Sequence, residues 1–291
     1  MHLYSVADTA FAVHVPERIF DGLLEERYSP FAVSSVDPAF VLTVSLTDTL
    51  EDRIPDQLVR RFGDEDPYLW LYRSGEEYRI GFSCHPFAPS SIIEGNAAEG
   101  YRLYVDTSVS NEVRDCCLNN AMMFLFTLHA SFNGSLVAHA SVVSYRDRGY
   151  VFLGRSGTGK STHSRLWLTH IPQTELLNDD NPVIHLVEGV PYVYGSPWSG
   201  KTSCYRNERV RLGGVVRLKQ APANRIHELS RLESLGSLMS SCSHVDWDPD
   251  SEEASMRTIG EVVAASRFWL LECLPDADAA IVCCRNVAEK E

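Results

Sequence analysis

The sequence predicts an α/β (α+β) protein with a β-rich N-terminal domain over residues 1–110 and a second domain over residues 111–291. Three observations support this prediction. Short runs of apolar, β-branched and aromatic residues, broken by turn residues, fill the first part of the chain. Helical periodicity begins near residue 111 and ends near 132. An apolar strand, a glycine-rich loop and a helical run then follow one another directly at 150–169.

The elements of the N-terminal part are short. Strands are expected where residues are apolar and β-branched, aromatic, or alternately apolar and polar, at 40–46, 68–72, 78–82 and 101–105. The helical run that follows is expected to end at Asn133-Gly134, because glycine readily adopts the left-handed conformation that closes a helix.

Two hairpins are expected in the second part. One joins 135–144 to 150–153 through a turn at 146–149, and the other joins 183–187 to 191–194 through a turn at Glu188-Gly189. Further strands are expected at 175–177 and 215–218, and helices at 161–169, 231–241, 255–268 and 277–288.

Composition narrows the classes of partner. The chain is 44% hydrophobic and 22% charged, an ordinary globular mixture with ample material for a core. Its formal net charge of −13 repels polyanions, so we expect no nucleic-acid partner. The same charge means that a site for any small anion needs its own local positive charge.

The eight cysteines form no C-x-x-C pair, and we expect reduced, largely buried thiols. The first residues lack the basic and apolar stretches of a signal peptide. The most apolar stretch, 121–132, is shorter than the roughly 20 residues that cross a bilayer. These observations favour a cytoplasmic protein without a membrane partner.

One segment carries a specific motif. Gly154 to Ser161 reads G-R-S-G-T-G-K-S and satisfies the P-loop pattern G-x-x-x-x-G-K-[ST]. The glycines let successive backbone N–H groups point into one concavity that holds phosphate oxygens, and the following helix adds its positive end. The predicted nucleotide-binding residues are Gly154, Ser156, Gly157, Thr158, Gly159, Lys160, Ser161 and Thr162. Lys160 is expected at the β- and γ-phosphates, and the Ser161 hydroxyl at Mg²⁺.

A pair of carboxylates follows the P-loop helix at one strand's distance. Asp179 and Asp180 end a short apolar run. One carboxylate in such a place holds Mg²⁺, and the other accepts the proton of an attacking hydroxyl. The pair alternatively forms a solvated turn, since Asp-Asp-Asn-Pro is also good turn chemistry.

Local positive charge is present farther along the chain. Residues 195–219 hold six basic residues against one acid, and a glycine-hinged loop there ends at Lys201. Lys201 and Arg206 are candidates for stabilising the charge on a transferring phosphoryl group. His139, on the strand expected beside the one that enters the P-loop, is a candidate for contact with the γ-phosphate or metal, or else an ordinary core histidine.

These residues resemble the HPr kinase/phosphorylase family, whose nucleotide-binding core is shared with phosphoenolpyruvate carboxykinases. The resemblance rests on a strand histidine, a hairpin, G-x-S-G-x-G-K-S and Asp-Asp at the end of the next strand, within residues 135–220. It implies a mixed-sheet core with antiparallel hairpins around the loop. It also implies a catalytic role for His139, with Asp179 as base and Asp180 as metal ligand, or the reverse. Homo-oligomers are implied too, without independent support from the residues.

Thr162 stands where HPr kinases usually carry an acidic residue. In this respect the chain looks more like divergent relatives, some of which phosphorylate peptides or small hydroxyl compounds. We therefore expect an ATP- and Mg²⁺-dependent kinase that phosphorylates a hydroxyl, such as a serine, of a protein, peptide or small molecule. The absence of a guanine-reading Asn-Lys-x-Asp segment favours ATP over GTP. The alternatives are a nucleotide-responsive regulatory protein and a carboxykinase-like enzyme.

Overall fold

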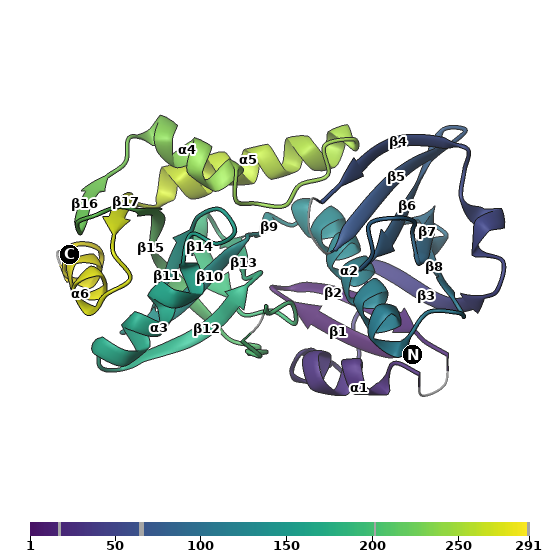
Figure 1. Ribbon diagram of the computed structural model, residues 1–291, viewed down its shortest axis with the longest axis horizontal. Helices are drawn as coiled ribbons and strands as arrows, with labels where there is room; N and C mark the ends of the chain where they lie inside the picture. Colours follow the sequence, from purple (N-terminus) through teal and green to yellow (C-terminus); the bar gives the residue numbers. More distant parts are fainter. Residues whose placement is uncertain (17–18, 64–66, 201, 290–291) are drawn as a thin grey trace. The chain divides into compact units, whose positions relative to one another are not determined.

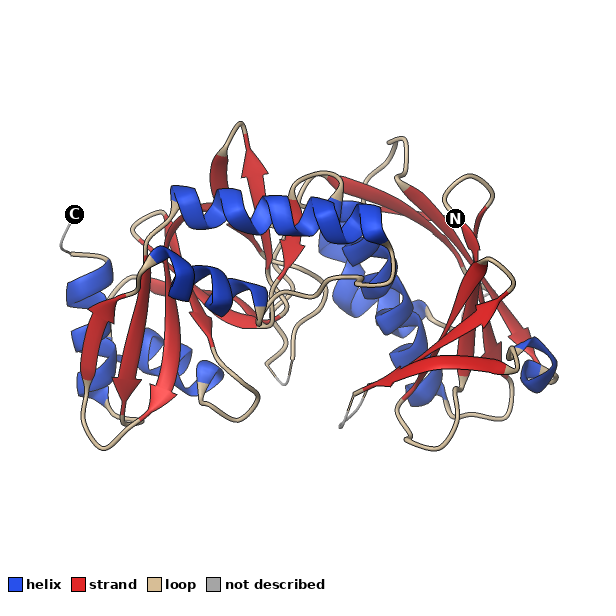
Figure 2. Ribbon diagram, turned by 90° about the horizontal axis from the view of Figure 1, so that it is seen from above, coloured by secondary structure: helices blue, strands red, loops and turns tan. Residues whose placement is uncertain are grey.

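The chain folds into two compact units. The computed structural model describes residues 1–16, 19–63, 67–200 and 202–289. The units are Met1–His129 and Ala130–Glu291, so the division falls at the end of helix α2 (Asn111–Ser131) rather than before it, at residue 110. Both units combine helices with a mixed sheet, and strands outnumber helices (Figures 1 and 2). None of the described helices is long and apolar enough to cross a membrane.

The first unit contains an eight-stranded sheet in the order β1-β2-β3-β8-β7-β6-β5-β4. Pairing is antiparallel except for the parallel pairs β2–β3 and β3–β8. The four strands expected from the sequence are present as β3, β5, β6 and β8, whereas β1, β2, β4 and β7 were not predicted. The strands are β1 (His2–Val6), β2 (Thr9–His14), β3 (Phe40–Thr47), β4 (Gln57–Phe62), β5 (Tyr68–Ser74), β6 (Glu77–Ser83), β7 (Ser91–Asn96) and β8 (Gly100–Asp106). Short helical turns are α1 (Asp21–Leu23), η1 (Leu24–Tyr28), η2 (Ser29–Phe31) and η3 (Leu50–Arg53).

Helix α2 belongs to the first unit because its apolar side packs on this sheet (Figure 1). The Phe124 ring lies 6.0 Å from that of Phe82, on β6. The Phe126 ring lies 6.3 Å from that of Phe11, on β2. Gly134, with φ of 67°, ends the helix as predicted.

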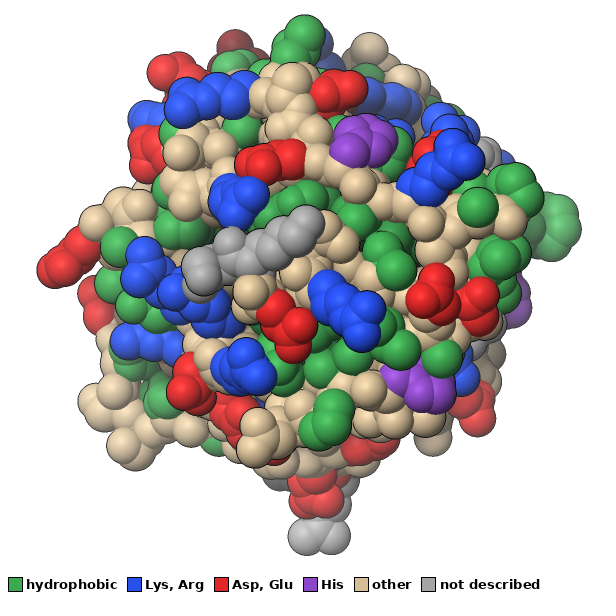
Figure 3. All heavy atoms as spheres, turned by 90° about the vertical axis from the view of Figure 1, so that its left-hand side faces the viewer, with side chains coloured by type: hydrophobic (Ala, Val, Ile, Leu, Met, Phe, Trp, Pro, Cys, Tyr) green, Lys and Arg blue, Asp and Glu red, His purple; other side chains and the backbone are tan. Residues whose placement is uncertain are grey.

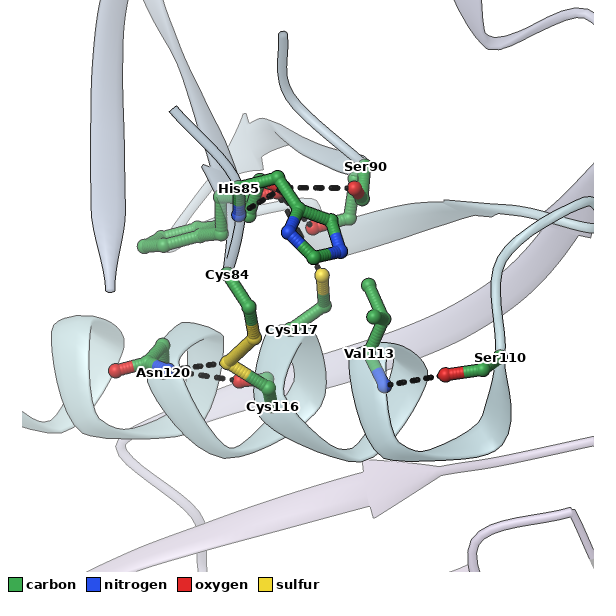
Figure 4. Close-up of a disulfide and its surroundings, with 11 residues drawn as sticks. Cys84, His85, Ser90, Ser110, Val113, Cys116, Cys117 and Asn120 are labelled. Carbon is green, nitrogen blue, oxygen red and sulfur yellow. Dashed lines mark hydrogen bonds between the residues drawn. A yellow bond between two sulfur atoms is a disulfide. The ribbon is translucent and has the colours of Figure 1, made fainter. Parts of the chain in front are cut away.

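Helix α2 is also joined to the sheet covalently. Cys84, directly after β6, and Cys116 on α2 form a disulfide (Figure 4). The expectation of reduced thiols is therefore wrong for these two residues. They are 32 positions apart in the sequence and are brought together only by the packing of α2 on β6. The other six cysteines are free. A cytoplasmic location stays a prediction.

The second unit contains a nine-stranded sheet in the order β12-β10-β11-β15-β14-β13-β9, with β17 beside β15 and β16 beside β17. Its strands are β9 (Ser135–Val137), β10 (Ala140–Tyr145), β11 (Arg148–Leu153), β12 (Thr174–Asp180), β13 (Val183–Val187), β14 (Val190–Tyr194), β15 (Arg209–Gln220), β16 (Arg225–Glu228) and β17 (Phe268–Cys273). Its helices are α3 (Lys160–His170), α4 (Arg231–Met239), α5 (Pro249–Ala265) and α6 (Ala277–Val287).

The hairpin predicted at 183–194 is confirmed, and the hairpin predicted at 135–153 is present over 140–153, whereas residues 135–137 form a separate strand, β9, that pairs with β13. Strands β10 and β11 pair antiparallel, and Arg146 and Asp147 turn between them with φ of 50° and 58°. Strands β13 and β14 pair antiparallel around Glu188 and Gly189, with φ of 51° and 76°. Two successive positive φ values match the twist of two-residue hairpin turns.

Helices cover both faces of this sheet (Figure 1). Helices α4 and α5 supply Leu238 and Ile259 to the core on one face. Helices α3 and α6 supply Trp167 and Cys283 to the core on the other face. Strand β15 pairs parallel with both β11 and β17 beneath these layers.

The helix predicted at 255–268 is misplaced. Helix α5 begins at Pro249 because the Asp248 side chain accepts a hydrogen bond of 2.9 Å from the Ser251 N–H and caps the helix. It ends at Ala265, and residues 268–273 form β17 instead.

Candidate functional site

Three strand ends bring the predicted site residues to one edge of the nine-stranded sheet. Ala140, at the start of β10, pairs with Leu153 at the end of β11 and with Asp180 at the end of β12. His139, which directly precedes β10, and Gly154, which directly follows β11, therefore lie at the same edge as Asp180. The antiparallel register produces this meeting, because antiparallel strands start where their neighbours end.

The glycine-rich loop has the backbone that its residues allow. Gly157 and Gly159 have φ of 76° and 107°, conformations that glycine adopts without the steric cost of a Cβ. Gly159 is the N-cap residue of α3, and Lys160 is its first residue. The unpaired N–H groups and the positive end of α3 therefore face the loop, the arrangement that binds phosphate in P-loop proteins.

Lys160 links the loop to the strand ends. Its Nζ lies 3.0 Å from the Gly154 carbonyl oxygen and 2.9 Å from Nε2 of His139. The other ring nitrogen of His139, Nδ1, lies 3.0 Å from Oδ1 of Asp180. Three candidates from three separate segments are thus connected in the order Lys160, His139, Asp180.

Lys160 is buried, with 9% of its surface exposed. Burial lowers the pKa of its ammonium group, and the nearby carboxylates of Asp180 and Asp179 oppose this by favouring the charged form. Lys160 is thus the cation at the loop, and the two carboxylates offset its charge, so an anion here also depends on the N–H groups of the loop and the positive end of α3.

The two aspartates are held differently. Asp179 is buried, and its backbone carbonyl accepts hydrogen bonds from the Gly200 N–H at 2.7 Å and the Ser199 hydroxyl at 3.3 Å. Asp180 is partly exposed, with φ of 149°, and its Oδ2 accepts a 2.9 Å hydrogen bond from the Asn181 amide. Segment 195–200, predicted to be a glycine-hinged loop, thus contacts the end of β12 through its backbone.

The donor set is compatible with magnesium. Mg²⁺ takes oxygen ligands and is usually held by one or two carboxylates together with substrate phosphates and water. Asp179 and Asp180 supply carboxylates at the loop edge, and Ser161 supplies a hydroxyl in the first turn of α3. The described residues contain no cluster of three His, Cys, Asp or Glu, so an all-protein metal cage is absent from that part of the chain.

Arg206 is not brought to the loop. Its guanidinium donates to the Leu176 carbonyl at 2.9 Å and forms ion pairs with Glu175 at 2.7 Å and Glu208 at 2.8 Å. These two carboxylates neutralise the charge of the Arg206 guanidinium, which lies beside β12. Lys201, the other predicted cation, lies outside the described residues. Ser156, Thr158 and Thr162 lie in the loop and the first turn of α3, as predicted.

Two further side chains contact the site and were not predicted. Gln220, the last residue of β15, donates from its amide to the Gly157 and Thr158 carbonyls at 3.3 and 3.4 Å. His163 lies in the first turn of α3 with its Nε2 accepting from Nε1 of Trp167, and burial lowers its pKa to about 4. Its spacing from Trp167, one helical turn, was readable in the sequence; the contact of Gln220 depends on β15 lying beside β11.

Two cavities flank the loop. One, of about 930 Å³, contacts the first half of the loop, Gly154 to Thr158, and lies between β15 and α4. The other, of about 540 Å³, contacts the second half and the first turns of α3, and is closed by the segments that follow β15 and β17. We refer to them as the α4 cavity and the α3 cavity. Ligand pockets in proteins span this range of volumes.

Charge is mixed on the surface of this unit. On the face that bears α6, at the left of Figure 1, Lys and Arg side chains lie among Asp and Glu side chains (Figure 3). The net charge of −13 is therefore not distributed as a uniform negative surface.

A scan against protein-family models finds no match to the chain, and a search of the curated proteins finds no match either.

Proposed function

We propose that this protein is an ATP- and Mg²⁺-dependent kinase that transfers the γ-phosphoryl group to a hydroxyl. The observation that carries the proposal is the connection of Lys160, His139 and Asp180 at the mouth of the G-x-x-x-x-G-K-S loop. The motif alone favours nucleotide binding. A carboxylate pair directly beside the lysine adds the groups that phosphoryl transfer to a hydroxyl requires.

The loop orients the triphosphate. Its N–H groups and the start of α3 hold the α- and β-phosphates, and Lys160 reaches the β- and γ-phosphates. Because Lys160 contacts the Gly154 carbonyl and His139, the γ end lies toward the first half of the loop. The α end then lies toward Thr162, where the α3 cavity begins. We place the nucleoside in the α3 cavity, whose walls include Leu166, Pro222 and Leu274.

Transfer needs a base and charge stabilisation. Asp179 accepts the proton of the acceptor hydroxyl as its oxygen bonds to the γ-phosphorus, the bond to the β-phosphate oxygen breaks, and ADP leaves. Asp180 orients His139 through Nδ1, and His139 and Lys160 face the transferring group. Bound Mg²⁺ would neutralise phosphate charge, with Ser161 and Asp180 as its protein ligands. Strand β10 lies antiparallel beside the P-loop strand β11, and β12 lies antiparallel beside β10, which supports a core of the HPr kinase type.

Calorimetric titration of Mg·ATP into the wild type and Lys160→Ala, followed by a phosphoryl-transfer screen against hydroxyl compounds and peptides, tests the proposal. We expect saturable binding that Lys160→Ala weakens by at least about tenfold, because a charge-assisted contact contributes about 1.5–3 kcal/mol. Equal affinity of the two proteins would show that the loop does not bind the triphosphate. Tight binding without transfer to any compound in the screen would favour a nucleotide-responsive regulatory protein.

A further inference from the structure

We infer that the α4 cavity binds the phosphoryl acceptor and that the acceptor carries an anionic group, a carboxylate or a phosphate, which Arg217 and Arg155 recognise. This inference rests on the proposed kinase function for the identity of the ligand as acceptor. The existence of an anion site beside the loop is independent of it.

The position of the α4 cavity indicates that it binds the acceptor and not the nucleoside. The α4 cavity contacts Gly154, Arg155 and Ser156, the half of the loop against which Lys160 lies. The γ end of the triphosphate is expected at this half, as argued above. A molecule in the α4 cavity therefore adjoins the γ-phosphate, whereas one in the α3 cavity adjoins the α-phosphate. Gln220, bonded to the Gly157 and Thr158 carbonyls, lines both cavities and stands between them.

Two cations of the α4 cavity have no carboxylate partner. Within the described part of the chain, neither Arg155 nor Arg217 forms an ion pair, although both are exposed. Arg217 donates a 3.3 Å hydrogen bond to the Ser237 hydroxyl of α4. In a chain of net charge −13, arginines are readily neutralised by neighbouring acids. Glu233 also lines this cavity, but its carboxylate accepts hydrogen bonds from the Ser230 N–H and hydroxyl at the start of α4. Two arginines without an ion pair in one cavity beside a phosphate loop are typical of an anion site.

Neighbouring cations show the contrast. Lys219, two residues along β15 and also in the cavity wall, is paired with Glu272 at 2.8 Å. Arg267, which directly precedes β17, is paired with Glu228 at 2.8 Å. Arg217 lies between these pairs in the same part of the sheet, next to Leu153 in the register. Among the residues that the structure describes, its side chain donates to the neutral hydroxyl of Ser237 and to no carboxylate.

The arginines also reduce the electrostatic repulsion between an anionic acceptor and the triphosphate. An anionic acceptor that approaches a triphosphate is repelled, and the repulsion is strong where water is excluded. Guanidinium groups at the boundary between the two ligands offset this repulsion and fix the orientation of the acceptor through paired hydrogen bonds. The Ser237 hydroxyl holds the Arg217 side chain across the cavity and is a positioning residue in this arrangement.

The test measures anion binding while the P-loop is filled. Protein saturated with Mg·AMP-PNP is titrated with inorganic phosphate and, separately, with citrate, at constant ionic strength. We expect saturable binding of at least one of the two anions. Arg217→Ala should weaken it by about tenfold or more, the effect of losing one charge-assisted contact of about 1.5–3 kcal/mol, with AMP-PNP affinity unchanged. Ser237→Ala should weaken it less, and Lys219→Ala, the matched control, should leave it unchanged.

Three results would overturn the inference. They are the absence of saturable anion binding to the loaded protein, an equal loss in Arg217→Ala and Lys219→Ala, and a loss of AMP-PNP affinity in Arg217→Ala as large as the loss of anion affinity. The last result would assign Arg217 to the nucleotide. AMP-PNP binding to the wild type is measured first. If the wild type does not bind AMP-PNP, that result counts against the kinase proposal. Titration of the unloaded protein with the two anions then tests the anion site by itself.

Discussion

The variant Lys160→Met separates the effect of Lys160 on the stability of the ligand-free protein from its contribution to ATP binding. Burial lowers the pKa of the Lys160 ammonium more than Asp180 and Asp179 raise it, so the charged side chain is a net burden on the folded protein without ligand. Methionine has a similar shape and no charge. We therefore expect the melting temperature of the ligand-free variant to equal or exceed that of the wild type.

The pH dependence of the unfolding free energy follows from the same lowered pKa of Lys160. Between the lowered folded-state pKa of Lys160 and its ordinary value of 10.5, the unfolded chain binds more protons than the folded protein. Stability of the wild type relative to the variant therefore rises with pH across that window, and the burden is greatest below it.

With ATP bound, the wild type should melt at a higher temperature than Lys160→Met. At an ATP concentration 100 times the wild-type Kd, binding adds about 2.7 kcal/mol to stability. Losing a contact of about 1.5–3 kcal/mol leaves between roughly 0.3 and 1.3 kcal/mol of this gain in Lys160→Met. At about 2–4 °C per kcal/mol, the ATP-induced shift falls from about 5–11 °C to at most about half of that.

Differential scanning fluorimetry with and without Mg·ATP, repeated across pH, measures these shifts. An ATP-induced shift in Lys160→Met equal to that of the wild type would refute the role of the lysine. A ligand-free variant that melts several degrees below the wild type would refute the argument that its burial is a net cost.

Four further variants have expected outcomes. Gly159→Ala should cost about 1–2 kcal/mol of unfolding free energy because φ there is 107°, whereas Gly260→Ala, in helix α5, should add about 0.5–1 kcal/mol; urea unfolding measures both. Ala221→Trp should fill the α3 cavity and weaken ATP binding by about tenfold while leaving inorganic triphosphate unaffected, as competition calorimetry would show. Replacing Cys84 and Cys116 by serine should cost about 3–4 kcal/mol in a urea titration without reducing agent, the loop-closure entropy of a 32-residue separation.

The sequence predicted the parts of the fold that have local causes. The turn residues Arg146-Asp147 and Glu188-Gly189 locate both hairpins, and the glycines of the loop locate the strand and helix on either side. Strand β17 was missed because the apolar run of Phe268–Cys273 has no periodicity that distinguishes a buried strand from a helix. The start of α5 was readable from Asp248 and Pro249, a capping residue followed by proline at the first helical position.

The sequence indicated the residues at the centre of the candidate site but not their contacts, and it did not reveal that Arg206 lies away from the loop or that Gln220 contacts it. The P-loop pattern and Asp179-Asp180 identify the groups, whereas the link from Lys160 through His139 to Asp180 depends on the registers of β10 with β11 and β12. The pairing of Arg206 with Glu175 joins positions 31 residues apart, which composition along the chain cannot reveal.

Label transfer from [γ-³²P]ATP is the most direct test of the kinase account. Wild type and Asp179→Asn are each incubated with Mg·ATP and the fractionated protein and small-molecule hydroxyl compounds of an extract, and the ATP affinity of both proteins is measured on the same samples. The account predicts label in one acceptor fraction with the wild type, and a loss of transfer by about 100-fold or more in Asp179→Asn at unchanged ATP affinity. Transfer by Asp179→Asn at the wild-type rate would contradict it.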